Sequence, residues 1–456
     1  MTQPAIHNRA EEKLYAGPRG VAVKILNRVE RSDAYLDKVL DAELRSEDMN
    51  ELDKGLMNEI VTGVVRWRMK VDWVLTGFFH GNFTKAETNI KNALRVALYQ
   101  ILFLDRVPHP AAVNEAVEFI KRLRGQKVAD LVNAVLRNIL RNVENNRYPV
   151  PAEDKIRHLA VIESHPVWMV RRWVDRFGYD DTKKLLSANN QRPDLSLRVN
   201  RLKIDFTYFT SLLDQHQVAY SRSQYLDFFV RVRHMAGIGA SEMFKQGFFA
   251  VQDESAGLPV LLLDPKPGDR VIDLCAAPGG KTTFIGELMK NMGELVAVDR
   301  YESRLALVKG ACQRLGIANA HIVIADAATL QTPPADRVLV DAPCSGLGVL
   351  AKKPDAKWSR EPEDLVDLVV LQRSILNNAA SLVKPGGILV YSTCTTEPEE
   401  NVNIVKEFLA QHAEFVLEPA QQFVNPALVN SEGHVETYPY KHGMDGSFAV
   451  RLKKNA

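Results

Sequence analysis

The sequence predicts a multi-domain protein: an all-α front, a small α+β middle module and a C-terminal α/β domain. The length of 456 residues is about three times that of a typical domain. Across the first third of the chain, apolar residues recur every three or four positions, as they do on amphipathic helices. From about residue 245 onward, short apolar runs alternate with helical stretches, which is the pattern of a parallel, doubly wound sheet.

The changes of pattern set the domain bounds that we predict, namely 1–150 for the helical domain, 151–240 for the middle module and 241–456 for the α/β domain. Five stretches of the first domain have helical spacing, and they are 21–30, 57–79, 90–104, 111–123 and 128–140. An Asn- and Pro-rich stretch at 142–154 is typical of a linker. In the middle module, two helical stretches at 165–178 and 181–190 precede a strand-like stretch at 196–202.

Composition excludes several classes of protein. With 46% apolar and 25% charged residues, the chain can build large cores and is not disordered. No run approaches the roughly 18 apolar residues that span a bilayer, and the N-terminal stretch lacks the apolar core of a secretory signal. We therefore expect a cytoplasmic protein without membrane contact. The cysteines form no C-x-x-C pair and no histidines have ligand spacing with a third partner, so we expect neither a disulfide scaffold nor a metal site.

Charge is distributed unevenly along the chain. Residues 1–240 contain 37 Lys and Arg against 29 Asp and Glu, whereas the remainder contains 21 against 27. A basic half joined to an acidic half is consistent with a polyanionic partner for the first half, because phosphate neutralisation provides most sequence-independent affinity for nucleic acid. A solvated helical surface is the alternative.

The predicted parallel strands lie at 271–276, 294–299, 320–326, 337–343 and 386–393. Ligands of such sheets bind beyond the carboxyl ends of the strands. The first strand runs into a loop whose small and Gly residues let a ligand approach the backbone at a helix N-terminus. The loop consists of Cys275, Ala276, Ala277, Pro278, Gly279, Gly280 and Lys281. The dinucleotide pattern G-x-G-x-x-G is absent, and Cys275 stands where a Walker loop needs glycine. A P-loop NTPase stays an alternative, since Gly280, Lys281 and Thr282 match the end of that motif.

Two further strands end in carboxylates. Asp299 is placed to accept hydrogen bonds from the hydroxyls of a ribose, and Asp326 from the exocyclic amine of an adenine. A single strand-end Asp is more often a helix cap. Two in successive strands, behind a loop with no pyrophosphate pattern, favour S-adenosylmethionine over NAD.

The last two parallel strands end near candidate reactive groups. Asp341 and Cys344 follow one strand and Cys394 follows the other, so two thiols and a carboxylate are expected at one edge of the sheet. Both cysteines leave their strands into loops rich in Gly, Ser and Thr, unlike Cys312, whose place on an amphipathic helix is typical of a core residue.

Three motifs, DLCAAPGGKT, DAPCSG and YSTCT, resemble those of the RNA cytosine-5 methyltransferases, and the helical front resembles a NusB-type RNA-binding domain. Together, over nearly the whole chain, they resemble the bacterial RsmB (Fmu/Sun) family of small-subunit ribosomal RNA methyltransferases. The resemblance implies a Rossmann-like S-adenosylmethionine domain with a mixed, mostly parallel sheet. It assigns Cys275 through Lys281 to the methionyl group, Asp299 to the ribose and Asp326 to the adenine. It also makes Asp341 the catalytic acidic residue, Cys394 the nucleophile and Cys344 the thiol that assists product release.

The implied reaction explains these residue types. A thiolate adding to carbon 6 of cytosine makes carbon 5 nucleophilic toward a methyl sulfonium. Asp341 could protonate ring nitrogen 3 if its carboxyl were neutral, or hold the exocyclic amine if ionised. Lys281 could favour the thiolate and orient Asp341, or be a solvated lysine at a helix start. Sequence chemistry alone does not decide which thiol attacks; the resemblance chooses Cys394. An amino-methyltransferase would carry an aromatic residue in place of Cys344.

The partner implied by the resemblance is 16S ribosomal RNA, and we expect a monomer. Basic residues of the first two domains are candidates for phosphate contacts: Arg66, Arg68, Lys70, Lys121, Arg122, Arg124, Arg137, Arg141, Arg171, Arg172, Arg198, Arg201 and Lys203. The rival function is a non-catalytic RNA-binding adaptor of NusB type, against which the intact Asp341, Cys344 and Cys394 argue.

Overall fold

The structure is a computed structural model, and its described residues are 14–32, 36–45, 49–142, 148–233 and 238–456. Contacts within the chain group it into two compact units. The first consists of Met1–Asn190 with Lys353–Ser359, and the second of Gln191–Lys352 with Arg360–Ala456. The predicted linker lies in part outside the described residues, at 143–147. The three domain bounds drawn from the sequence stay a prediction.

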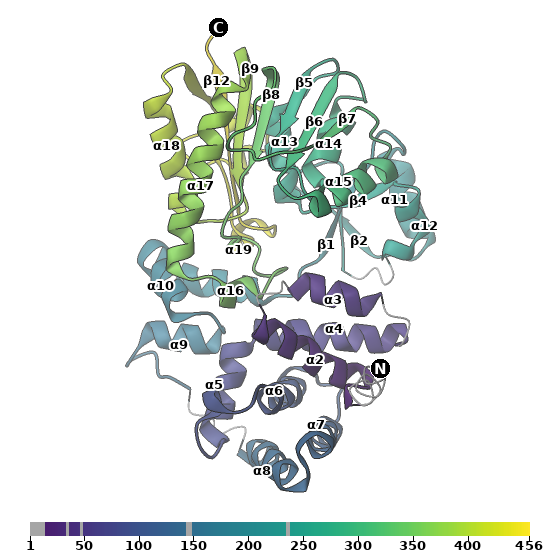
Figure 1. Cartoon of the computed structure of the whole chain (residues 1–456), viewed down its shortest axis with the longest axis vertical. Coiled ribbons are helices and arrows are strands. Elements are labelled where there is room, and N and C mark those ends of the chain that lie inside the picture. Colours follow the sequence, from purple (N-terminus) through teal and green to yellow (C-terminus); the bar gives the residue numbers. More distant parts are fainter. Residues whose placement is uncertain (1–13, 33–35, 46–48, 143–147, 234–237) are drawn as a thin grey trace, which may run out of the picture. The chain divides into compact units, whose positions relative to one another are not determined.

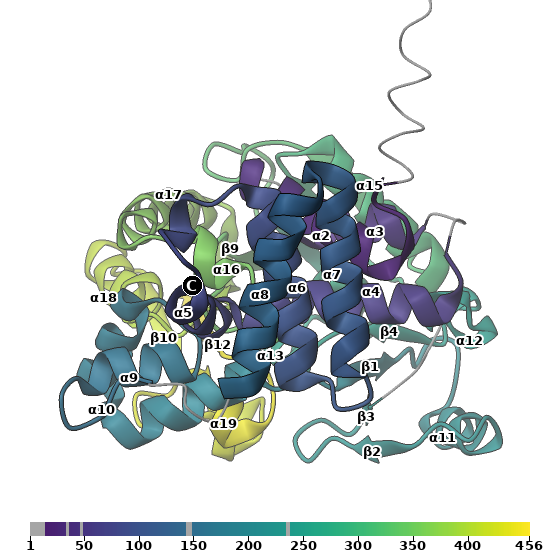
Figure 2. The same ribbon diagram turned by 90° about the horizontal axis from the view of Figure 1, so that it is seen from below.

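The first unit is helical (Figure 1). Its longer helices are α2 (Gly17–Arg31), α3 (Leu36–Leu44), α4 (Glu51–Arg66), α5 (Arg68–Phe78), α6 (Thr88–Phe103), α7 (His109–Arg124), α8 (Gln126–Asn142), α9 (Lys155–Ile162) and α10 (Val167–Asn190). Figure 2 shows α6, α7 and α8 side by side. Buried apolar residues of α2 to α8 form one core. The short helix α16 (Ala356–Ser359) belongs to this unit although it comes late in the chain.

One helix differs from its prediction. The stretch 57–79 is expected as a single helix, but α4 ends and α5 begins at Trp67, whose φ of −105° and ψ of 20° are not helical. The Trp67 ring stacks on Phe103 at 4.8 Å between centroids, and the freed N–H of Met69 donates to Ser164 Oγ at 2.9 Å. Tertiary packing therefore ends the helix at Trp67, where the sequence has no Gly or Pro to predict a break.

The second unit begins with a four-stranded antiparallel sheet of order β2-β3-β1-β4. Its strands are β1 (Leu195–Val199), β2 (Tyr220–Arg222), β3 (Phe229–Val232) and β4 (Phe249–Val251). Helices α11 (Phe206–Gln215) and α12 (Glu242–Lys245) pack on its apolar core. The strand predicted at 196–202 is β1, whereas α9 and α10, which precede it, group with the first unit.

The larger sheet has the order β10-β12-β9-β8-β5-β6-β7, with β11 paired to β12. Its strands are β5 (Arg270–Asp273), β6 (Glu294–Asp299), β7 (Ala320–Ile324), β8 (Ala335–Asp341), β9 (Val383–Thr393), β10 (Phe415–Glu418), β11 (Val435–Thr437) and β12 (Ser447–Lys454). Strands β5 to β9 pair in parallel, while β12 is antiparallel to both β9 and β10. This mixed, mostly parallel sheet is the predicted α/β fold.

Helices cover both faces of this sheet (Figure 1). On one face lie α13 (Glu254–Leu263), α14 (Gly280–Leu288) and α15 (Glu302–Leu315), and on the other lie α17 (Pro362–Ser381) and α18 (Val402–Gln411). Successive residues of β5 serve opposite faces: Val271 packs with α13 and α14, and Ile272 packs with α17 and α18. Among the described helices, none is long and apolar enough to cross a membrane.

Candidate active site

The strand register brings the predicted site residues to one edge of the sheet. Asp341, at the end of β8, lies opposite Ser392 of β9, and Asp299, at the end of β6, lies opposite Ile324 of β7. Because these strands are parallel, the loops that follow them share this edge.

The loop after β5 is hydrogen-bonded at its start to the two neighbouring strands, β6 and β8. The Ala276 N–H donates to Val298 O at 2.8 Å, and the Leu274 N–H donates to Leu339 O at 3.0 Å. Gly279 then precedes α14 with φ of +106°, where a side chain would be strained, and a Cβ there would meet Val308 Cα at 3.0 Å. Glycine is therefore needed where the chain enters α14 so close to Val308 of the next helix, α15.

Asp273, the last residue of β5, is a buried carboxylate that the sequence analysis did not select. Thr282 Oγ1 donates to its Oδ2 at 2.7 Å, while Oδ1 has no hydrogen-bond partner among the described residues. Burial raises the pKa of Asp273 to about 7, against the opposing hydrogen bond from Thr282. An acidic residue inside an apolar strand was the sequence feature that could have identified it.

The two predicted nucleoside contacts differ in burial. Asp299 is 5% exposed; its Oδ1 accepts the Tyr301 N–H at 3.0 Å, and its Oδ2 lies 3.6 Å from Arg304. Asp326 is partly exposed, and its Oδ1 accepts the Ala328 N–H at 2.9 Å. Each carboxylate thus makes one local turn contact, as in a cap, through Oδ1, and the Oδ2 of Asp326 lies 3.9 Å from Arg300 much as that of Asp299 lies near Arg304.

Lys281 and Asp341 form a short ion pair, with Nζ and Oδ2 2.6 Å apart. The other carboxylate oxygen of Asp341 accepts the Ser392 hydroxyl at 2.9 Å. Burial alone would lower the pKa of Lys281, but the charge and hydrogen bond of Asp341 raise it above its ordinary value. The Lys281 side chain is 16% exposed, so it is not the solvated lysine of the alternative interpretation.

The two candidate thiols lie together, with 3.2 Å between the sulfurs of Cys344 and Cys394. A hydrogen bond from the Cys344 thiol lowers the pKa of Cys394; burial and the charge of Asp341 oppose this, and the charge of Lys281 reinforces it. The same hydrogen bond, together with burial, raises the pKa of Cys344 well above its ordinary value. Cys394 is therefore the thiol of this pair that ionises first.

The other two cysteines are chemically quieter. Burial raises the pKa of Cys275, as do the charges of Asp341, Asp273 and Asp299. Cys312 is a buried residue of the α15 core, as predicted, and burial raises its pKa to about 11.

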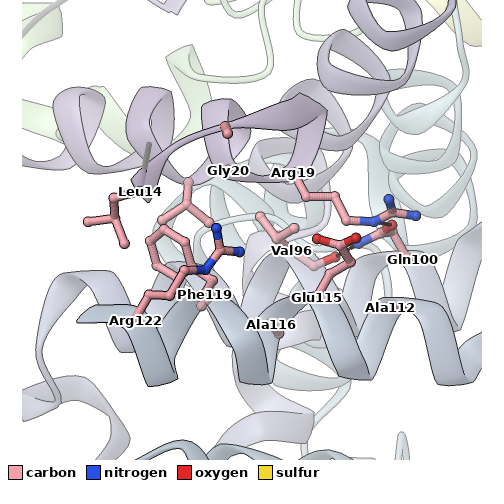
Figure 3. Close-up of a pocket in the computed structure, with 13 residues that line it drawn as sticks. Leu14, Arg19, Gly20, Val96, Gln100, Ala112, Glu115, Ala116, Phe119 and Arg122 are labelled. Carbon is pink, nitrogen blue, oxygen red and sulfur yellow. Dashed lines mark hydrogen bonds between the residues drawn. The ribbon is translucent and has the colours of Figure 1, made fainter. Parts of the chain in front are cut away.

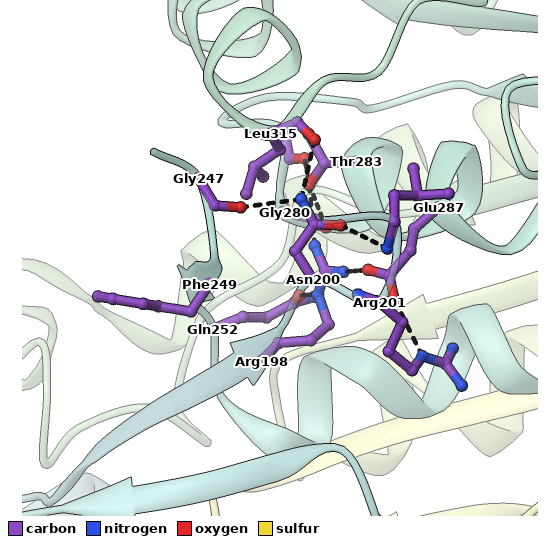
Figure 4. A network of polar contacts seen from close by, with 12 residues as sticks. Arg198, Asn200, Arg201, Gly247, Phe249, Gln252, Gly280, Thr283, Glu287 and Leu315 are labelled. Carbon is purple, nitrogen blue, oxygen red and sulfur yellow. Dashed lines mark hydrogen bonds and ion pairs between the residues drawn. The ribbon is translucent and has the colours of Figure 1, made fainter. Parts of the chain in front are cut away.

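The helix α14 that carries Lys281 is supported by a buried polar network (Figure 4). Arg198 of β1 pairs with Glu287, and donates to Gln252 Oε1 at 2.7 Å and Thr283 Oγ1 at 3.1 Å. Burial lowers the pKa of Arg198 to about 10. The prediction of Arg198 as a phosphate contact is wrong, because its side chain is 1% exposed and faces the protein interior.

Comparison with known proteins identifies the family of the chain. The family profile described as "16S rRNA methyltransferase RsmB/F" matches residues 260–453, the NusB family profile matches 17–141, and that of the RsmF/B-like ferredoxin-like domain matches 165–238. The probable ribosomal RNA small subunit methyltransferase B of Bacillus subtilis is 35% identical over 448 residues, which cover 96% of this chain and 98% of that protein. The chain belongs to the ribosomal RNA small subunit methyltransferase B family.

Other relatives agree along nearly the full length. The ribosomal RNA small subunit methyltransferase B of Erwinia tasmaniensis is 33% identical, covering 96% of this chain and 98% of that protein. The crystal structure of PH0851 has a TM-score of 0.81 and 28% identity, covering 96% of this chain and 99% of that chain. The chain is thus a methyltransferase of the RsmB/F family that acts on ribosomal RNA and uses S-adenosylmethionine, with a NusB domain at its front.

The residues at the sheet edge fit S-adenosylmethionine by their chemistry. Asp273 Oδ1 is a buried acceptor without a partner among the described residues, and Asp299 brings a second buried carboxylate. A cationic, amine-bearing nucleoside is complementary to such an edge.

Several predicted phosphate contacts of the family's NusB domain are exposed, as phosphate binding requires: Lys121, Arg122, Arg124, Arg137 and Arg141. Arg124 is engaged by Glu87 at 2.7 Å. Arg66 is only 9% exposed, so its prediction as a phosphate contact is also wrong.

A pocket in the first unit is separate from the predicted catalytic and cofactor-binding residues. It lies among α2, α6 and α7, where Arg19 Nε donates to Gln100 Oε1 at 2.7 Å and Phe119 forms part of the wall (Figure 3). None of the predicted catalytic or cofactor-binding residues lines it. Within the described part of the chain, no group of three His, Cys, Asp or Glu side chains gathers as a metal site needs.

Proposed function

We propose that this chain methylates carbon 5 of a cytosine in 16S ribosomal RNA through a covalent bond between Cys394 and carbon 6 of the base. The observation that carries the proposal is the pair of thiols 3.2 Å apart beside the Lys281–Asp341 ion pair. A single buried cysteine is commonly just an apolar core residue. Two thiols in contact, next to a charged pair, suit a reaction in which a carbon–sulfur bond forms and later breaks.

Cys394 is the proposed nucleophile. Carbon 5 of cytosine is too weakly nucleophilic to take a methyl group from a sulfonium unaided, and addition of a thiolate to carbon 6 turns carbon 5 into an enamine carbon. The lowered pKa of Cys394, caused first by the Cys344 hydrogen bond, supports this role. Bound S-adenosylmethionine supplies the methyl group.

Asp341 is the proposed contact to the base. Of the two roles that the sequence leaves open, holding the exocyclic amine is favoured, because both oxygens of Asp341 are already acceptors, one for Lys281 and one for the Ser392 hydroxyl. Lys281 then fixes the orientation of Asp341 and adds positive charge near the Cys394 sulfur.

Cys344 is proposed to act when the product leaves. After carbon 5 is methylated, a base takes its proton, the bond between carbon 6 and sulfur breaks, and the electron pair returns to Cys394. A protonated Cys344 beside that sulfur can stabilise the returning thiolate by donating a hydrogen bond. The raised pKa of Cys344, from this hydrogen bond and burial, supports its protonated form.

The proposed cofactor contacts keep the assignment made from the sequence. Cys275 through Lys281 would contact the methionyl group, Asp299 the ribose hydroxyls and Asp326 the adenine amine. The first unit would hold the RNA through its exposed basic residues. The monomeric state, the cytoplasmic location and the absence of a metal stay predictions from the sequence.

A non-catalytic RNA-binding adaptor is the second candidate, and it fails to explain why both thiols and the Lys281–Asp341 pair are kept in contact. The test is methyl transfer from labelled S-adenosylmethionine to deproteinised 16S ribosomal RNA, followed by digestion to nucleosides. The proposal predicts label in 5-methylcytosine. Label in another nucleoside would refute the cytosine-5 assignment, and no transfer to naked or subunit-bound RNA would favour the adaptor.

A further inference from the structure

Two adjacent residues, Glu400 and Asn401, contact the loops that hold the thiols. Glu400 ends the short 3-10 helix η4 (Pro398–Glu400), and Asn401 precedes α18. Both side chains are buried, at 0% and 3% exposed. Neither has a role in the reaction proposed above, and burying a carboxylate and an amide requires that each find partners.

The Glu400 carboxylate holds the backbone on both sides of Cys344. Its Oε1 accepts the Ser345 N–H at 2.8 Å, and its Oε2 accepts the Ser345 hydroxyl at 2.5 Å. Gln372 of α17 donates both to Glu400 Oε1 at 2.9 Å and to Pro343 O at 2.8 Å. The peptides before and after Cys344 are therefore fixed through one carboxylate.

The Asn401 amide does the same for Cys394. Its Oδ1 accepts the Thr393 hydroxyl at 2.5 Å, and its Nδ2 donates to Thr395 O at 3.0 Å. The two loops are joined as well, because Ser345 Oγ lies 2.9 Å from Thr395 Oγ1. Each thiol thus has its neighbours held by one member of the Glu400–Asn401 pair.

We propose that Glu400 and Asn401 are positioning residues of the reaction, which set the contact between the Cys344 and Cys394 sulfurs. This inference rests on the proposed function for its meaning in catalysis. The geometry fixes the thiol contact, and the negative charge of Glu400 disfavours a second negative charge on Cys344.

Charges from several elements act on this pair of thiols. Lys281 of α14 acts on Cys394, as do Asp341 of β8 and Asp445 of the segment before β12, while Glu400 of η4 acts on Cys344. Burial raises the pKa of Glu400 itself, and the hydrogen bonds from Ser345 and Gln372 oppose that rise. Replacing Glu400 by Gln removes its charge but keeps an acceptor for the Ser345 N–H.

The first arm of the test needs neither RNA nor cofactor. The full chain is treated with iodoacetamide across a pH series, and the alkylation rate of each cysteine is followed by mass spectrometry. In the unsubstituted protein, Cys394 should react faster than Cys344. Glu400→Gln should reduce this preference about tenfold, the effect of one pKa unit. Asn401→Ala should reduce it as well, by releasing the Cys394 loop.

The second arm measures methylation. Both variants should lose roughly 100-fold in kcat, the scale of a 1 Å misplacement, while the KM for S-adenosylmethionine stays unchanged. Ser345→Ala removes only the hydroxyl contact and should show a smaller loss in the same direction. The matched control is Glu407→Gln, which changes an exposed carboxylate of α18 that pairs with Arg373 of α17, and it should alter neither readout.

Unchanged thiol preference and kcat in variants that bind cofactor normally would overturn the proposal. A loss of cofactor affinity equal to the loss of kcat in Glu400→Gln, Asn401→Ala and Ser345→Ala alike would also overturn it, because it would indicate a general effect on the fold. If Cys394→Ala still methylated cytosine, the covalent mechanism would fail, yet the alkylation arm would still decide whether Glu400 and Asn401 order the two thiols.

Discussion

The buried carboxyl group of Asp273 makes the stability of the folded protein depend on pH. Its carboxyl group is buried, and burial raises its pKa to about 7, whereas an Asp in an unfolded chain titrates near 3.9. Between these two values the folded protein binds a proton that the unfolded chain does not. The contribution of Asp273 to stability is therefore fully present below about pH 4 and is lost as the pH rises through about 7.

Asp273→Asn should remove this loss, since the amide does not ionise. We expect the free energy of unfolding of the variant, relative to the unsubstituted protein, to increase by roughly 1–3 kcal/mol between pH 5 and pH 8. Denaturant titrations at both pH values measure it. A difference that stays constant with pH would mean that Asp273 is ionised throughout the range.

The sequence predicted the site residues that follow strand ends, but not the residues whose hydrogen bonds hold those loops in place. Lys281, Asp341, Cys344 and Cys394 could be found because strand ends share one edge. Glu400 and Asn401 lie in an ordinary acidic stretch, and their importance comes from hydrogen bonds to loops that are distant in sequence. The prediction that Arg198 contacts phosphate failed for a related reason. The strand pattern shows which face of the sheet a residue lies on, but not that Arg198 pairs with Glu287 there.

At the scale of elements, α14 connects two sheets. It begins at the loop predicted to bind the cofactor. Arg198 of the four-stranded sheet contacts Thr283 and Glu287 of α14, and also Gln252 just after β4 (Figure 4). The small sheet therefore supports the cofactor loop, in addition to any contact it makes with RNA.

Arg198→Met should weaken S-adenosylmethionine binding about tenfold, or about 1.4 kcal/mol, because the start of α14 loses its ties. Calorimetry with the cofactor measures the affinity. The control is Arg451→Met, which breaks the ion pair of a buried arginine with the partly exposed Glu418, between β12 and β10. Both variants should lose stability, but only the first should lose affinity; equal affinities would show that the network serves folding alone.

Strand predictions succeeded where apolar runs were continuous. β5 to β9 follow the predicted stretches. The final strand, β12, lies one place from the edge of the sheet, where β10, a strand of four residues that the sequence did not predict, pairs with it. Short strands lack the alternation that makes them visible in sequence.

At the scale of the whole molecule, the two units carry different charges and chemistry. The first has exposed basic residues on α7 and α8, and the second has the thiols and the carboxylates of the sheet edge. The late segment Lys353–Ser359 belongs to the first unit, where Lys357 donates to Asn190 Oδ1 at 2.7 Å and Trp358 to Val65 O at 2.7 Å. No sequence pattern shows such an exchange of segments.

Replacing Lys121, Arg137 and Arg141 by Gln together should weaken ribosomal RNA binding and lower its salt dependence by about one unit of slope for each phosphate that the variant no longer neutralises. Binding titrations at several salt concentrations measure both. The matched control replaces Lys266, Lys309 and Lys453, exposed lysines of the second unit. An equal effect of the two triple variants would mean that the first unit does not direct RNA binding.

The most direct test of the proposed chemistry is a denaturing gel of the Cys394→Ala and Cys344→Ala variants with substrate RNA and S-adenosylmethionine. Cys394→Ala should form no covalent protein–RNA species and no methylated product, because no sulfur is left to attack carbon 6. Cys344→Ala should transfer methyl but release slowly, leaving a denaturation-resistant adduct. A shifted band with Cys394→Ala and none with Cys344→Ala would reverse the two roles, and retained methylation without a band in either variant would refute covalent catalysis by these cysteines.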